Sequence, residues 1–214
     1  ISIIIMYRPT IFQENDLDKL VAFIKANSFA TLVSICDGIP CASHIPLVVT
    51  VEADIVKLTG HLAKQNPQWQ DFAAAESLAI FTGAHAYISP TLYEKHESVP
   101  TWNYIAVHAY GIPKVITLAD SPKLMNEMID KMVDAYEATY QKQWDGLSDK
   151  YREGMMNGII GFEMTVSRLE GKYKLSQNKS QTDQQNVAES LLNSADAIEQ
   201  NVGAEMKQNL ELDK

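Results

Sequence analysis

Short β-rich runs separated by tight turns fill the first half of the chain, and this spacing limits the possible folds more than any other feature. Between the runs there is room for only one or two short helices, whereas a parallel sheet would need a helix after nearly every strand. The pattern therefore predicts a mainly β (α+β) fold built on an antiparallel sheet or small barrel. The predicted strands are 30–36, 39–51, 55–59, 77–88 and 102–116.

Helices are expected around this sheet. Asp16 is placed to cap a helix that ends near residue 27, and Pro67 is placed at the first position of a short helix. In the second half, Ser121-Pro122 opens a long helix, and a final strand covers 159–166. Asp183 is expected to cap a terminal helix.

The charge balance of the 214 residues limits the kinds of partner. Eighteen basic and 27 acidic residues give a net charge of −9. Nucleic acids and anionic bilayers attract basic surfaces, so direct DNA binding is doubtful and no membrane partner is expected. The apolar run at residues 1–5 is too short to span a bilayer. We interpret it as an upstream extension and expect a cytoplasmic protein.

The two cysteines, Cys36 and Cys41, lie on either side of Asp37-Gly38, a pair typical of a hairpin turn. Neighbouring strands could bring them close enough for a disulfide. In a reducing cytoplasm, however, two half-buried thiols are the expected state. No zinc-ligand spacing surrounds them, so no metal is predicted.

A candidate phosphate site lies where the predicted third strand meets the short helix, at residues 60–67. Such a junction directs backbone N–H groups at a ligand, and Lys64 adds a full charge. Lys57, Lys64 and Lys95 are the only lysines or arginines between positions 26 and 113. Lys64 is therefore the natural partner for an anion, although an isolated lysine is more often a solvated surface residue.

Aromatic residues gather in two segments, 85–90 and 100–104. Tyr87, Trp102 and Tyr104 offer ring surfaces, and nearby hydroxyl and amide groups offer directional hydrogen bonds. This combination suits a flat ligand such as a flavin. The alternative is that Trp102 and Tyr104, which alternate along a strand, are core residues on one face.

Six segments resemble the PaiB family of FMN-binding negative transcriptional regulators of protease synthesis and sporulation. The resemblance runs from Met6 to about Leu192 and implies a split β-barrel of the pyridoxamine-phosphate-oxidase type, with flanking helices. It also implies a homodimer with FMN at the subunit interface. Accordingly, 6–180 is interpreted as the FMN-binding domain and 181–214 as a C-terminal helix and tail. The matching segments are 44–47, 60–69, 84–90, 99–104, 107–111 and 171–178.

The resemblance also implies which residues bind the cofactor. In the wider superfamily a Ser-Arg-Lys run often holds the flavin phosphate, and Ala63-Lys64-Gln65 stands in its place here with one cation instead of two. The basic residues Arg168, Lys172, Lys174 and Lys179 could supply the missing charge across a dimer interface, or could form a solvated basic loop. The predicted cofactor-binding residues are His44, Ile45, Pro46, Leu47, His61, Leu62, Ala63, Lys64, Asn66, Ser89, Trp102, Asn103, Tyr104, Lys174, Ser176 and Gln177.

The leading functional hypothesis is an FMN-binding protein that influences transcription, through DNA, a regulatory partner or flavin chemistry. One alternative is an FMN-dependent oxidoreductase or flavin reductase in which His44, His61 or Tyr104 positions the substrate. Another is a haem-binding split barrel, because histidines are available. No nucleophile elbow, Walker loop or Rossmann glycine triplet is present, so no catalytic residue is assigned.

Overall fold

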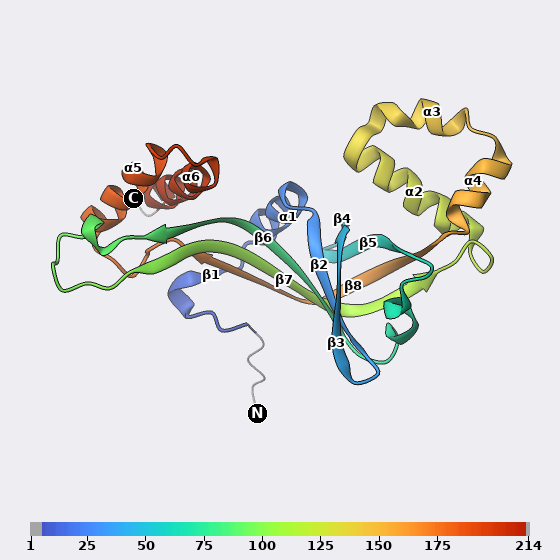
Figure 1. The fold of residues 1–214 in the computed structure, drawn as a ribbon, viewed down its shortest axis with the longest axis horizontal. Coiled ribbons are helices and arrows are strands. Elements are labelled where there is room, and N and C mark those ends of the chain that lie inside the picture. Colours follow the sequence, from blue (N-terminus) through green and yellow to red (C-terminus); the bar gives the residue numbers. More distant parts are fainter. Residues whose placement is uncertain (1–5, 213–214) are drawn as a thin grey trace. The chain divides into compact units, whose positions relative to one another are not determined.

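Three long strands, β6, β7 and β8, are consecutive neighbours in the sheet (Figure 1). The computed structural model describes residues 6–212, so the predicted extension at 1–5 lies outside the described residues. The chain divides into two compact units, and each long strand contributes to both. The first unit takes residues up to 23, 82–107 and those from 170 onward; the second takes 24–81 and 108–169. The strands are β6 (Ser77–Ile88), β7 (Thr101–Ile116) and β8 (Ile159–Lys174).

The second unit contains a barrel. Among the described residues, the strand order is β3-β2-β6-β7-β8-β5-β4. The strands at the two ends of this order, β3 and β4, follow one another in the chain with only the buried Leu47 between them. The two edges of the sheet must therefore meet, which closes it. The remaining strands of this unit are β2 (Phe29–Cys36), β3 (Ile39–Pro46), β4 (Val48–Glu52) and β5 (Ile55–Ala63).

The predicted hairpin is confirmed. β2 and β3 pair from Phe29↔Pro46 to Cys36↔Ile39, and Asp37 and Gly38 both have positive φ, at 50° and 78°, as a tight two-residue turn requires. The predicted single run 39–51 is two strands. Proline has no N–H to donate, and β3 ends at Pro46.

The cysteines contradict the sequence-based expectation. Cys36 and Cys41 form a disulfide, with their Cα atoms 6.0 Å apart. The register explains why they can. Cys41 lies opposite Ser34, two residues before Cys36, so both sulfurs belong to the inward-facing side of the hairpin. The expectation of two separate thiols came from the presumed compartment and not from geometry.

Helices cover one end of this unit's core. Met125, Met128 and Met132, one face of α2, pack with Met156 and Ile116. The predicted long helix is thus confirmed, and Ser121 directly precedes it. The helices here are η2 (Pro67–Asp71), α2 (Pro122–Glu137), η4 (Ala138–Tyr140), α3 (Gln141–Asp145) and α4 (Asp149–Met156).

The first unit contains the C-terminal part of β6, the N-terminal part of β7, the C-terminal part of β8 and a pair of helices. α5 and α6 pack against each other (Figure 1), where the predicted terminal helix was single. Ser180, and not Asp183, caps α5: its Oγ accepts a hydrogen bond from the Asp183 N–H at 3.1 Å. Within residues 6–212, no helix has the length and apolar character needed to cross a bilayer. The unit also includes η1 (Thr10–Phe12), β1 (Gln13–Glu14), most of α1 (Leu17–Ala26), η3 (Pro90–Leu92), α5 (Gln181–Leu192) and α6 (Ala197–Leu212).

Candidate functional site

The predicted cofactor-binding residues fall into two groups, one in each unit, and each group is described by itself. The second unit holds those from the ends of β3 and β5, and the first unit holds those from β6, β7 and β8. The second-unit group is His44, Ile45, Pro46, Leu47, His61, Leu62, Ala63, Lys64 and Asn66. The first-unit group is Ser89, Trp102, Asn103, Tyr104, Lys174, Ser176 and Gln177.

A glycine brings the two segments of the second-unit group together. A Cβ on Gly60 would lie 2.7 Å from the Leu47 Cδ2 and 3.2 Å from the Pro46 carbonyl oxygen. Only glycine lets β5 approach the β3–β4 junction this closely. The side chains of Ile45 and Leu62 point into the core, at 8% and 2% exposure. These two residues can therefore present only backbone groups to a ligand.

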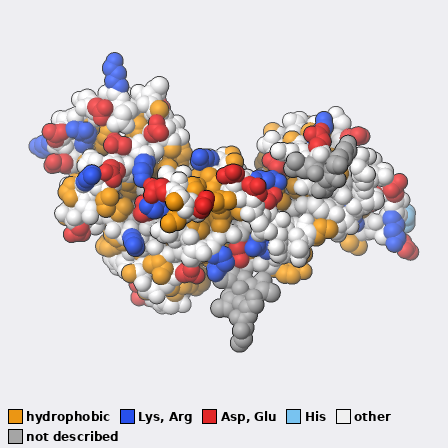
Figure 2. Space-filling view, turned by 180° about the vertical axis from the view of Figure 1, so that it is seen from behind, with side chains coloured by type: hydrophobic (Ala, Val, Ile, Leu, Met, Phe, Trp, Pro, Cys, Tyr) orange, Lys and Arg blue, Asp and Glu red, His pale blue; other side chains and the backbone are white. Residues whose placement is uncertain are grey.

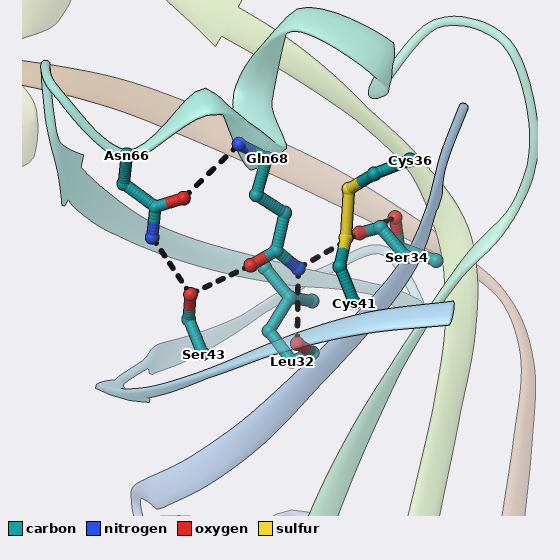
Figure 3. Close-up of a disulfide and its surroundings, with 8 residues drawn as sticks. Leu32, Ser34, Cys36, Cys41, Ser43, Asn66 and Gln68 are labelled. Atoms are coloured by element: carbon teal, nitrogen blue, oxygen red, sulfur yellow. Dashed lines mark hydrogen bonds between the residues drawn. A yellow bond between two sulfur atoms is a disulfide. The ribbon is translucent and has the colours of Figure 1, made fainter. Parts of the chain in front are cut away.

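A closed set of hydrogen bonds fixes the chain just after β5 (Figure 3). Asn66 Nδ2 donates to Ser43 Oγ at 2.8 Å, and Ser43 Oγ donates to Gln68 Oε1 at 2.6 Å. Gln68 Nε2 donates to Leu32 O and to Ser34 Oγ, both at 3.0 Å. We call Ser34, Ser43, Asn66 and Gln68 the amide network. Gln68 is only 2% exposed, so water cannot replace these partners.

The amide network also builds the short helix. Asn66 Oδ1 accepts a hydrogen bond from the Gln68 N–H at 3.0 Å and so caps η2. Sequence patterns predicted Asn66 and the helix start at Pro67, but they missed Ser43 and Gln68. Their roles depend on contacts between β3 and η2 that are distant in sequence.

Lys64 lies in the turn between β5 and η2, with its side chain exposed. Its N–H donates to Gly158 O at 2.9 Å, and its carbonyl accepts a hydrogen bond from Trp69 Nε1 at 3.2 Å. Both the N–H and the carbonyl of Lys64 are thus held by hydrogen bonds. Among residues 6–212 the Lys64 ammonium makes no ion pair, whereas the Lys57 ammonium lies 3.1 Å from a carboxylate oxygen of Glu52. The charge of Lys64 is therefore available to an anion.

The two histidines of this group have partners inside the unit. His44 is exposed, and its Nδ1 lies 3.0 Å from Thr31 Oγ1. His61 Nδ1 lies 3.4 Å from Met132 Sδ, and burial lowers the pKa of His61. Burial therefore favours the neutral form of the His61 ring. A role for either histidine in positioning a substrate stays a prediction. Within the described part of the chain, no cluster of three His, Cys, Asp or Glu side chains is placed to hold a metal ion.

An exposed aromatic surface characterises the first-unit group. Trp102 is 54% exposed and makes an edge contact with Tyr87, with ring centroids 5.9 Å apart. The centroid of the His85 ring lies 6.2 Å from that of Trp102. The alternative interpretation of Trp102 as a core residue is therefore wrong. An exposed indole supported by a second ring is suited to contact a flat ligand.

Two lysines on β8 lie beside this surface without a neutralising carboxylate. Lys174 donates to Thr101 Oγ1 and to the Trp102 carbonyl. Lys172 is 8% exposed, and its ammonium lies 5.2 Å from the centre of the Tyr104 ring. Neither forms an ion pair within residues 6–212. Burial lowers the pKa of Lys174, and the nearby positive charge of Lys172 lowers it further. The alternative of a solvated basic loop is wrong for these two residues.

The remaining predicted residues of the first unit bond to one another or to nearby backbone. Asn103 is fully buried, and its Nδ2 donates to Ser176 Oγ at 2.9 Å. Gln177 Nε2 donates to Tyr173 O at 2.6 Å. Ser89 Oγ accepts a hydrogen bond from the Thr91 N–H and so caps η3. These contacts give the four side chains structural partners, which leaves Trp102, Tyr104 and Lys174 as the side chains of this group best suited to meet a ligand.

Comparison with known proteins shows the family. A family model described as "Putative FMN-binding domain" matches residues 6–168. The Bacillus subtilis protein named Protease synthase and sporulation protein PAI 2 is 40% identical over 191 residues, covering 88% of this chain and 90% of that protein. The chain belongs to this FMN-binding family, the PaiB family. An uncharacterized protein of Emericella nidulans is 30% identical, covering 83% of this chain and 82% of that protein.

Solved structures confirm the split-barrel fold. The FAD and heme binding protein from Mycobacterium smegmatis aligns with a TM-score of 0.55 at 14% identity, covering 76% of this chain and 73% of that one. The flavocytochrome Anf3 from Azotobacter vinelandii aligns with a TM-score of 0.56, also at 14% identity, covering 76% and 69%. The predicted fold class is thus confirmed, and membership of the family assigns FMN as the cofactor. An available ammonium on a fixed turn is the kind of donor that a flavin phosphate needs.

Proposed function

We propose that this protein is a homodimeric, FMN-binding regulatory protein that receives the flavin phosphate at the turn after β5. The observation that supports this most is the unpaired ammonium of Lys64 on a turn whose course the amide network fixes. Bound FMN would supply reversible electron and hydride transfer. The protein's own part is to hold the phosphate with Lys64, and to offer the backbone of His44–Leu47 to the ligand.

Replacing Lys64 with alanine is expected to weaken FMN binding by about 1–3 kcal/mol, since a hydrogen bond to a charged group is lost. Fluorescence titration of FMN with the purified protein measures the change. Lys57→Ala is the matched control, because Lys57 lies on β5, the strand that leads into the Lys64 turn, but its charge is already paired with Glu52. Equal loss of affinity in both variants would show that general charge, and not this turn, attracts the phosphate.

In the first unit, we propose Trp102 as a ring contact and Lys174 as an anion contact. Trp102 offers an exposed indole face, and Lys174 carries a charge that no carboxylate neutralises within the described residues.

The homodimer is proposed from the outward face of the β2–β3 hairpin. Phe29 is 69% exposed and Ile35 40%, and the residues opposite them across the hairpin are Pro46 and Pro40. Exposed apolar side chains of this kind are often covered by another subunit. We expect Phe29→Glu to convert the dimer to monomers at micromolar concentration in light scattering, whereas Tyr151→Glu, an exposed site on α4, should leave the mass unchanged.

The regulatory role is proposed to run through a protein partner and not through direct contact with DNA. The net charge is −9, and on the face drawn in Figure 2 Lys and Arg side chains are interspersed with Asp and Glu. A role in transcription also places the protein in the compartment that holds the genome, in agreement with the predicted cytoplasmic location. We expect no DNA retention in a filter-binding assay at low salt; binding that weakens steeply as salt rises would contradict this.

A further inference from the structure

The disulfide adjoins the amide network on the inward side of the hairpin (Figure 3). Cys41 lies opposite Ser34 and two residues before Ser43, and Cys36 lies two residues after Ser34. Alternate residues of a strand share a face, so both sulfurs share a side with the two serines. Each of these serines bonds directly to the side chain of Gln68.

The hairpin does not need this disulfide to hold its shape. β2 and β3 pair along their whole length, and the turn at Asp37-Gly38 already closes them. A disulfide that closes so short a loop restricts the unfolded chain less than one that closes a long loop. Both cysteines are partly exposed, so a small thiol can reach the bond from solvent. Stability alone therefore explains this disulfide poorly, and in a reducing compartment a disulfide is more often a redox site.

We infer that Cys36–Cys41 is a thiol-exchange site for a low-molecular-weight thiol, and that its state controls the order of the phosphate-binding turn. The second half of this inference rests on the proposed function of Lys64. A thiolate of the small thiol attacks one sulfur, forms a mixed disulfide and releases the other cysteine as a thiolate, which takes a proton from water. A second small thiol then attacks the mixed disulfide. The protein gains two electrons and two protons, and the small thiol leaves as its own disulfide.

We expect reduction of the disulfide to affect the Lys64 turn through Ser34 and Ser43. Two thiol sulfurs cannot stay at bonding distance, so the Cys36 and Cys41 side chains must turn apart on the face that they share with Ser34 and Ser43. The adjustment acts on Ser34 and Ser43, whose hydroxyls hold the Gln68 amide. Because Gln68 is buried, it has no water to compensate for a stretched bond. Asn66, which bonds to Ser43 and caps η2, then loses its fixed position next to Lys64.

The test equilibrates the purified protein in buffers of reduced and oxidised glutathione at several ratios. Alkylation followed by intact-mass measurement counts the free thiols. Hydrogen exchange is measured on peptides covering residues 64–72, with a peptide from α2 as the internal control. We expect two thiols to appear together as the ratio rises, with exchange at 66–72 at least tenfold faster and α2 unchanged. The double variant Cys36→Ser with Cys41→Ser should exchange like the reduced protein at every ratio.

FMN titration in the same buffers completes the test, with a several-fold weaker dissociation constant expected for the reduced protein. Exchange at 66–72 that is the same in both states, or cysteines that stay bonded in excess reduced glutathione, would overturn the inference. If the double variant does not fold, the wild-type measurements decide alone. If exchange responds but Lys64→Ala does not alter FMN affinity, the proposed phosphate site fails and the coupling between disulfide and turn stands.

Discussion

Phe72→Ala is expected to lower the free energy of unfolding by about 3–5 kcal/mol, the usual cost of removing a buried phenylalanine ring. Phe72 is fully buried directly after η2, and its ring meets the ring of Phe162 edge-on with centroids 5.2 Å apart. The ring anchors the end of η2 in the barrel core, where β8 supplies the partner. Its loss removes transfer free energy and leaves a cavity that the paired strands cannot close.

Urea denaturation followed by circular dichroism measures this effect. Tyr151→Ala provides the control, since Tyr151 is 55% exposed on α4 and should change stability by no more than about 0.5 kcal/mol. If Phe72→Ala cost as little as the control, the barrel core would have to repack around the missing ring. The segment between Asn66 and Phe72 would then be held by its hydrogen bonds alone.

Local patterns predicted the elements that local chemistry determines. Asp37-Gly38 predicted the hairpin because only small residues with positive φ can make its turn, and Asp16 predicted the start of α1, where its Oδ1 accepts a hydrogen bond from the Lys19 N–H. Asn66-Pro67 predicted the start of η2, because Asn66 caps the helix and proline is favoured at its first position. The phosphate-binding role of the Lys64 segment, which stays a prediction, was inferred in the same way, because the charge and the start of the helix lie in neighbouring residues.

Contacts between distant segments could not be predicted in this way. The closure of the barrel depends on Gly60 next to Leu47, and no local pattern marks that approach. Gln68 resembles its exposed neighbour Gln70 in sequence, yet it is the buried centre of the amide network. The prediction of two free thiols was wrong because it relied on a presumed reducing compartment, whereas the register of β2 and β3 brings the two cysteines together. Asn103 and Ser176, predicted to bind the cofactor, are 73 residues apart and bond to each other, a contact that no local pattern indicates.

The amide network gives the second large effect. We expect Gln68→Ala to lower the free energy of unfolding by roughly 2–4 kcal/mol, because it removes three buried hydrogen bonds, each of which contributes about 0.5–1.5 kcal/mol. The substitution deprives the Leu32 carbonyl and the Ser34 and Ser43 hydroxyls of the Gln68 amide. Chemical denaturation measures the loss, and FMN titration should show weaker binding as well, since the turn that carries Lys64 loses its support.

Gln70→Ala is the matched control for this prediction, because Gln70 lies in the same short helix with its side chain exposed. It keeps the Asn66 cap and should alter neither stability nor FMN affinity. Gln68→Glu separates shape from hydrogen bonding: the side chain keeps its size, but an ionised carboxylate cannot donate to Leu32 O. If Gln68→Glu were as stable as the wild type at neutral pH, packing and not the hydrogen bonds would hold η2. The network could then not transmit a change at the disulfide to the phosphate-binding turn.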